Sequence, residues 1–279
     1  MKSDLHIHTI YSDSTLTPSE VVSCAKNAGI SCLSITDHET MEGIPFVQAI
    51  ASDIVVIPGI EIGCEGGKES EEIHILGYFV DPENSRFKEL LVSIRQAREK
   101  RVELILKKLA RSGIQIEFDE VKKSAGPGTI GRLHIASLLY KQGSGSDVIS
   151  CFKRYLSFGS IGWVEREALP TPDLAIHLIK EAGGISVFAH PHQMINRIPQ
   201  LVKAGLMGIE VFHPKITHVV QKFLIQKATQ YDLFVTGGSD CHGKMKEEEP
   251  GIGKNFLSDE YSAKFFWKLE NMNYAQINL

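Results

Sequence analysis

Residues 1–13 read MKSDLHIHTIYSD and predict a short buried strand followed by a turn. His6 and His8 are two residues apart, a spacing that places both imidazoles on the same face of a strand. An ordinary core strand would carry apolar side chains where this segment has polar ones. A His-x-His pair near a carboxylate can offer nitrogen and oxygen ligands to a divalent metal. Two structural histidines would explain this stretch equally well, so the other ligands must come from elsewhere in the chain.

The composition is that of an ordinary globular protein of 279 residues, with 43% hydrophobic and 23% charged residues. A formal net charge of -4 gives no general basic surface for duplex DNA. The sequence shows no apolar leader and no run of 18 uncharged apolar residues, which predicts a cytoplasmic protein without a membrane span. Five scattered cysteines without a Cys-x-x-Cys pair argue against a cysteine zinc site.

Strands and helices alternate at both ends of the chain, which is typical of a parallel α/β fold. The predicted strands cover residues 4–8, 30–35, 54–59, 73–79, 185–189, 208–212 and 233–238. Between them, residues 82–160 contain no convincing strand, and residues 86–112 have the pattern of a long amphipathic helix. We therefore expect a discontinuous α/β domain of residues 1–81 and 161–279, with a helical insertion domain at 82–160.

Polar residues recur at or just past the ends of the predicted strands. Because ligands of α/β barrels and open α/β sheets sit at the carboxyl ends of the strands, these side chains should converge on one mouth. Nitrogen and oxygen donors without sulfur suit manganese, zinc, iron or magnesium, and so many histidines predict two or three divalent ions. The residues at strand ends are His6, His8, Asp37, His38, Glu61, His190, His213, Asp240 and His242, and His74 lies within a strand.

Six ordered motifs resemble the PHP (polymerase and histidinol phosphatase) superfamily over nearly the whole chain. They are DLHIHTIYSD, ITDHET, PGIEI, EIHILGYF, AHP and GGSDCHG. The GRLHIA motif in the insertion resembles the subgroup of nucleoside 3',5'-bisphosphate phosphatases that also act as 5'-3' exoribonucleases on short RNA. One departure is Leu133, which stands where the pattern has proline. The resemblance implies a distorted (β/α)7 barrel.

Three metal positions are implied by this resemblance. The first would be held by His6, His8, Glu61 and Asp240, and Glu61 would bridge to a second ion. The second would also be held by His74 and His190, and the third by Asp13, His38 and His242. Asp37 precedes His38 and could instead support a histidine from behind.

The expected function is a metal-dependent phosphoesterase, with manganese as the first metal to consider. A metal-activated hydroxide would attack the phosphate monoester of a nucleoside 3',5'-bisphosphate, releasing the 3'-phosphate, or the 5' end of short RNA. Candidate substrate contacts are Arg132, His134, Arg98 and Arg101, and candidate catalytic residues are His190 and His213. Histidinol phosphate phosphatase and a non-catalytic metal-stabilised domain are the alternatives. The sequence does not predict the oligomeric state.

Overall fold

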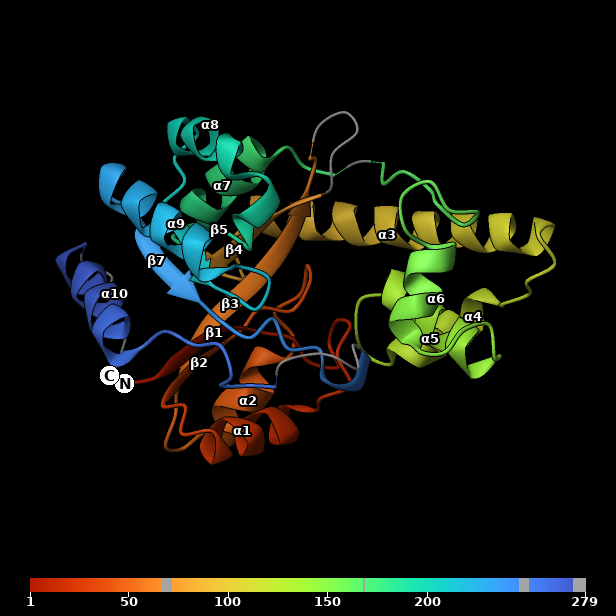
Figure 1. The fold of residues 1–279 in the computed structure, drawn as a ribbon, viewed down its shortest axis with the longest axis horizontal. Helices are drawn as coiled ribbons and strands as arrows, with labels where there is room; N and C mark the ends of the chain where they lie inside the picture. The colour runs from red at the N-terminus through yellow and green to blue at the C-terminus, as the bar shows by residue number, and fades with distance from the viewer. Residues whose placement is uncertain (67–71, 168, 246–250, 273–279) are drawn as a thin grey trace.

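Seven strands form one curved sheet in the computed structural model, which describes residues 1–66, 72–167, 169–245 and 251–272 (Figure 1). The strands follow one another around the sheet in the order β1 to β7. Their bounds are β1 (Ser3–Ile7), β2 (Cys32–Ile35), β3 (Val55–Cys64), β4 (Ile73–Tyr78), β5 (Ile185–Phe188), β6 (Gly208–Phe212) and β7 (Phe234–Gly237). After β7 the chain returns to β1, where Asp240 N donates to His6 O at 2.9 Å and Ile7 pairs with Cys241. The barrel is therefore nearly closed, as predicted.

The strand directions differ from the expected parallel pattern at β4. The pairs among β1, β2 and β3 and among β5, β6 and β7 are parallel, whereas β4 is antiparallel to both β3 and β5. A parallel crossover needs a dozen or more residues, and residues 65–72 are too few. As a result, the amino-terminal end of β4 lies at the same edge of the sheet as the carboxyl ends of the parallel strands.

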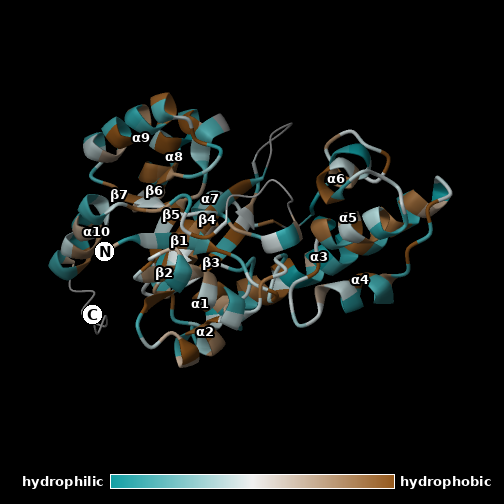
Figure 2. Ribbon diagram, turned by 60° about the horizontal axis from the view of Figure 1, so that its bottom comes forward, coloured by the Kyte–Doolittle hydropathy of each residue, from teal (hydrophilic) through white to brown (hydrophobic). Residues whose placement is uncertain are grey.

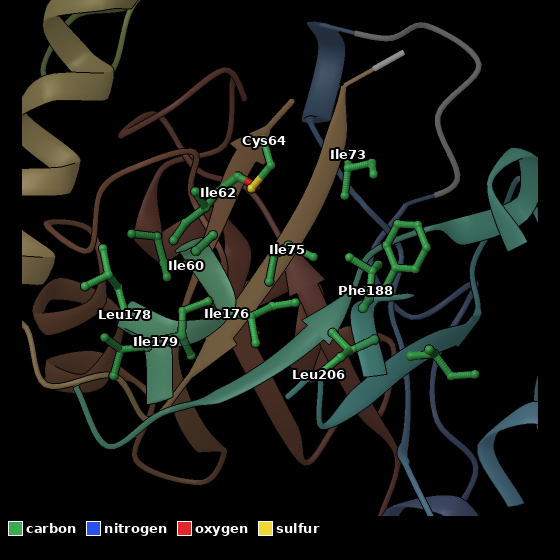
Figure 3. Close-up of a cluster of buried hydrophobic side chains, with 14 of the residues drawn as sticks. Ile60, Ile62, Cys64, Ile73, Ile75, Ile176, Leu178, Ile179, Phe188 and Leu206 are labelled. Carbon is green, nitrogen blue, oxygen red and sulfur yellow. The ribbon is translucent and has the colours of Figure 1, made fainter. Parts of the chain in front are cut away.

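Helices cover the outside of the barrel. They are α1 (Pro18–Asn27), α2 (Ile44–Ile50), α7 (Pro172–Glu181), α8 (Ile198–Lys203), α9 (His218–Gln230) and α10 (Asp259–Asn271). Teal and brown alternate along them in Figure 2, as expected for helices with one buried face. Figure 3 shows Ile60, Ile62 and Ile75 of β3 and β4 packing beside Ile176 and Ile179 of α7. None of the described helices is both long and apolar enough to cross a membrane.

The insertion is helical, and its first helix connects two hydrophobic cores. It consists of α3 (Ser85–Arg111), α4 (Phe118–Ala125), α5 (Arg132–Lys141) and α6 (Val148–Tyr155). The first half of α3, from Phe87 to Ile94, packs into the barrel core, and the second half packs against α4, α5 and α6. The helix α4 was not predicted: it has only 8 residues, and its capping box is built on Glu117, an unusual N-cap residue.

Candidate functional site

Glu61 lies at the centre of the barrel mouth. We expected it just past a strand end, but β3 continues to Cys64, and Glu61 lies within the strand with only 1% of its surface exposed. Both carboxylate oxygens face ring nitrogens at 2.8–3.3 Å. Oε2 faces His6, His8 and His38, and Oε1 faces His74 and His190. One carboxylate therefore joins five imidazoles.

The donor atoms of His6, His8, Glu61 and Asp240 form a compact buried group. The two histidine Nε2 atoms are 3.2 Å apart, and each lies 3.2–3.3 Å from Glu61 Oε2. Asp240 Oδ1 lies 3.5 Å from His6 Nε2 and 3.3 Å from His8 Nε2. A tetrahedral ion with bonds of about 2.0–2.1 Å separates its ligand atoms by about 3.3 Å. The observed spacing therefore fits a divalent ion.

A second group of donors lies on the other side of His8. It contains His8, Asp13, His38 and His242. His242 Nε2 lies 3.2 Å from Asp13 Oδ1, and His38 Nε2 lies 3.8 Å from Asp13 Oδ2. Asp13 Oδ1 and His38 Nδ1 are buried, and no described group makes an aligned hydrogen bond with either. Since buried polar atoms nearly always have partners, these atoms also fit a site for a cation.

A third group contains His38, Glu61 and His74. His74 Nδ1 lies 2.8 Å from Glu61 Oε1, and His190 Nε2 approaches the same oxygen at 3.2 Å. His74 reaches the mouth because it is at the beginning of β4, the antiparallel strand. His38 is thus shared: its Nδ1 faces Glu61 and its Nε2 faces Asp13.

Buried hydrogen bonds hold the histidine rings in place. Glu210 Oε1 accepts from His6 Nδ1 at 3.0 Å, and its Oε2 accepts from the His190 backbone N at 2.8 Å. Asp37 accepts from the Ser12 hydroxyl, whose oxygen in turn lies 3.3 Å from His8 Nδ1. Asp37 therefore lies behind a histidine, although it is connected to His8 and not to its neighbour His38. In His6 and His8 alike, the Nε2 atom is left to face Glu61 and Asp240.

Burial and charge act against each other on the ionisable groups. Burial lowers the pKa of His38 to about 3 and that of His190 to about 4, so both rings are neutral at pH 7. Burial would also lower the pKa of His74, but the charge of Glu61 raises it to about 9. Burial opposes the ionisation of Glu61 itself, yet the surrounding histidines hold its pKa well below the usual range. Glu61 therefore stays ionised and stabilises positive charge directly beside it, as at His74.

Two of these residues have left-handed backbones, with φ of 32° at His190 and 49° at Asp240. Such conformations cost roughly 1–3 kcal/mol each in residues other than glycine and are found mainly where the surroundings enforce them. Glu210 holds the His190 backbone N, and Asp240 N is bound to β1. The barrel thus imposes the positions of these two side chains.

Four arginines and two glutamates border the cluster on the insertion side. Glu39 lies 2.6 Å from Arg98 Nε and 2.9 Å from an Arg166 nitrogen. Glu72 lies 2.9 Å from both Arg101 and Arg166, 3.8 Å from Arg132 and 3.9 Å from His74. The group carries two more positive than negative charges. Arg132 and Arg98 keep 25% and 14% of their side chains exposed, whereas Arg101 is 8% exposed.

His134 lies at the contact between the insertion and the barrel. It is 1% exposed, and its Nδ1 accepts from the Gly131 backbone N at 3.1 Å. Nearby, Thr129 N donates to Tyr11 O at 3.1 Å, and the Thr129 hydroxyl donates to His38 O at 3.0 Å. A cavity of about 280 Å³ opens beside this contact, lined by residues that include Thr40, Arg95, Arg98, Lys122, Gly128 and Thr129.

His213 directs one ring nitrogen at the cluster. Its Nδ1 accepts from the Lys215 backbone N at 3.1 Å, so the proton of the neutral ring must be on Nε2. That atom lies 3.3 Å from Asp240 Oδ2. His213 can therefore donate a hydrogen bond to a group bound at the mouth.

Four residues of the site were not singled out from the sequence: Glu39, Arg166 and Glu210, which are buried, and Glu72, which is partly buried. Glu210 was the easiest of these to predict, since it is a charged residue in the middle of the otherwise apolar strand Gly208–Phe212. Glu72 and Arg166 precede a strand and a helix in ordinary polar segments. No local pattern in the sequence distinguishes them.

An α/β barrel with clustered nitrogen and oxygen donors beside an excess of arginines defines a metal-dependent enzyme that acts on an anion. The chain belongs to the PHP domain family, whose profile matches residues 4–159. A 5'-3' exoribonuclease of Haemophilus influenzae is 35% identical over 250 residues, which is 86% of this chain and 90% of the relative. A 3',5'-nucleoside bisphosphate phosphatase of Chromobacterium violaceum is 32% identical over 250 residues, and the alignment covers 86% of each protein.

The similarity extends to three dimensions. A Bifidobacterium adolescentis structure assigned to the metal-dependent phosphoesterases superposes with a TM-score of 0.86 at 30% identity, covering 95% of this chain and 96% of the other. The chain is therefore a metal-dependent phosphoesterase, as predicted, and the non-catalytic alternative is set aside.

Proposed function

We propose that the protein hydrolyses the phosphate monoester of a nucleotide, either the 3'-phosphate of a nucleoside 3',5'-bisphosphate or the 5' end of short RNA. The names of the two relatives support this choice of substrate. The observation that carries it is the position of Glu61, which joins the donor groups next to the arginine cluster. A phosphate bound between them would contact cations on both sides.

The proposed ligand sets are those implied by the sequence motifs, and they differ from the donor groups in two ways: His190 replaces His38 beside Glu61 and His74, and His8 is left out of the set with Asp13. One ion would be held by His6, His8, Glu61 and Asp240, a second by Glu61, His74 and His190, and a third by Asp13, His38 and His242. We propose manganese as the resident metal, since the set contains only nitrogen and oxygen donors. Bound divalent ions would polarise the phosphoryl oxygens and lower the pKa of water.

The protein's own side chains would position the substrate. Arg132 and Arg98 keep accessible surface, and we assign them to the phosphoryl oxygens. Arg101 would hold Glu72 in place, and Glu72 in turn lies 3.8 Å from Arg132. His134 is nearly inaccessible, so we assign it to the contact between insertion and barrel.

His213 was one candidate for proton transfer, but its Nδ1 accepts from the Lys215 backbone N and its ring has a single proton, on Nε2, so we assign it to a hydrogen bond with the leaving oxygen at the mouth. His190 was also a candidate for proton transfer. Its pKa of about 4 leaves the ring without a second proton at neutral pH, and its Nε2 faces Glu61, so a role as ligand is favoured.

Histidinol phosphate is the less favoured substrate. Its cationic amine would need a carboxylate in addition to the metal ligands. The three carboxylates that border the donor groups most closely are already paired: Glu39 and Glu72 with arginines, and Glu210 with His6 and the His190 backbone N. Pairing one of them with the amine would break a buried ion pair or hydrogen bond.

The test is a panel of substrates assayed with manganese and with a chelator. It contains a nucleoside 3',5'-bisphosphate, a nucleoside monophosphate, a short 5'-phosphorylated RNA and histidinol phosphate. We expect the highest kcat/KM for the bisphosphate or the RNA and no turnover with the chelator. A preference for histidinol phosphate would refute the proposed substrate class.

A further inference from the structure

The insertion and the rest of the chain carry opposite charge. Residues 82–160 contain 15 Lys and Arg against 8 Asp and Glu, a formal net charge of +7. The remaining residues contain 15 against 26, a net charge of -11, and the two values account for the -4 of the whole chain. A phosphate monoester needs only the few cations at the mouth. The wider positive charge of the insertion suits a polyanion that extends beyond the reacting phosphate.

An aromatic pair of one exposed and one partly buried ring lies at the end of the insertion, in the segment after α6. Phe158 is 74% exposed, and its ring is in edge-on contact with Trp163, with centroids 5.4 Å apart. The guanidinium groups of Arg101 and Arg132 lie 5.1 and 5.3 Å from the Trp163 ring. A large exposed ring is costly in water, but here it is held in place on a fixed support. Such a ring is suited to stacking.

The aromatic pair is continuous with the barrel mouth through a chain of contacts. From Trp163 the chain passes to Arg132, then to Glu72 at 3.8 Å, and then to His74 at 3.9 Å. Helix α3 runs alongside these contacts: its Arg101 pairs with Glu72, and its Lys108 donates to the Trp163 carbonyl. Seven residues of helix span roughly 10 Å. A nucleotide chain that begins at the mouth and follows these contacts would reach Phe158.

We propose that Phe158, supported by Trp163, stacks against a nucleobase of single-stranded RNA downstream of the phosphate that is cleaved. Every base has an aromatic face, so this contact would bind RNA without a strong sequence preference. Lys153 and Arg154 are exposed in the last turn of α6, a few residues before Phe158 in the sequence, and would attract the phosphate backbone. This inference rests on the proposed function and adds to it a contact that only an oligonucleotide can make.

The kinetic test compares two substrates, uridine 3',5'-bisphosphate and a 5'-phosphorylated pentauridylate. Removal of one stacking contact weakens binding on the order of 10-fold. Phe158→Ala should therefore lower the ratio of kcat/KM for the RNA to that for the bisphosphate by about 10-fold. Phe158→Trp keeps an aromatic ring at this position and should leave the ratio near its wild-type value. The control is Phe223→Ala, which removes an exposed phenylalanine on α9 (43% exposed) and should leave the ratio at its wild-type value.

A binding test separates this inference from the proposed function. The chain has two tryptophans, and a Trp267→Phe background leaves Trp163 as the only one. With a chelator present, pentauridylate should quench its fluorescence and uridine 3',5'-bisphosphate should not. The stacking role of Phe158 would be refuted if pentauridylate still quenched the fluorescence of Phe158→Ala. It would also be refuted if Phe158→Ala lowered kcat/KM equally for the RNA and the bisphosphate. If the wild type cleaves neither substrate, the proposed function fails, while the fluorescence titration still decides whether RNA binds here.

Discussion

Replacing Glu210 by glutamine should weaken metal binding without any change in a metal ligand. The carboxylate accepts two hydrogen bonds, from His6 Nδ1 at 3.0 Å and from the His190 backbone N at 2.8 Å. A glutamine has one oxygen, and the backbone N can only donate, so that oxygen must face His190. The amide NH₂ then faces His6 Nδ1, which must become an acceptor.

The consequence is a change of tautomer at His6. With Nδ1 accepting, the neutral ring carries its proton on Nε2, the atom 3.3 Å from Glu61 and 3.5 Å from Asp240. A protonated Nε2 cannot bind a metal. Forcing the other tautomer leaves two buried donors opposed, which costs about 1–3 kcal/mol, or roughly a 10- to 100-fold loss in metal affinity.

The assay is titration of the metal-free protein with manganese in competition with a chelator of known affinity. We expect one class of sites to weaken by this factor in Glu210→Gln, and activity to return at high manganese. Asp53→Asn, at an exposed surface ion pair with Lys26, is the control and should leave the affinity unchanged. Wild-type affinity in Glu210→Gln would refute the tautomer argument, and a loss of folded protein before metal is added would show a structural role instead.

Three further outcomes are expected. Arg132→Ala should raise KM for the phosphorylated substrate at least 10-fold with metal content unchanged by elemental analysis, because the side chain carries charge toward the substrate without being a metal ligand. Removing the metals should lower the melting temperature, since it leaves buried carboxylates and imidazoles uncompensated. The Glu39 pKa is lowered from 4.5 to about 2, against the effect of burial, by Arg98 and Arg166. Its contribution of about 3 kcal/mol is therefore present above pH 4.5 and lost as the pH falls toward 2. Acid unfolding should show this loss in the wild type and not in Glu39→Gln.

The donor groups were predictable because they follow strand ends. His6, His8 and His38 are short-range features of motifs, and the rule that side chains converge at one edge of the sheet correctly placed them together. The rule misplaced Glu61, because the length of β3 is set by its pairing with β4 and not by the proline and glycine at 58 and 59. It also missed the reversal of β4, since periodicity carries no information on strand direction.

The supporting residues could not be found from the sequence for a different reason. Glu210 is 204 residues from His6, and Arg166 is 127 residues from Glu39 and 94 from Glu72. Each is a single charged residue whose partner appears only when the barrel has closed. Their burial would be unfavourable without those partners, so the chemistry becomes visible only with the folded structure.

Helix α3 explains how the acidic barrel and the basic insertion can contribute to one reaction. Its 27 residues would be about 40 Å long, and they belong to the barrel core at one end and to the insertion core at the other. Arg98 and Arg101 lie in the middle, where they pair with Glu39 and Glu72 of the barrel. Moving the insertion would bend a continuous helix and break these buried pairs. The distance from the donor groups to the cationic groups is therefore set by the fold before any substrate binds.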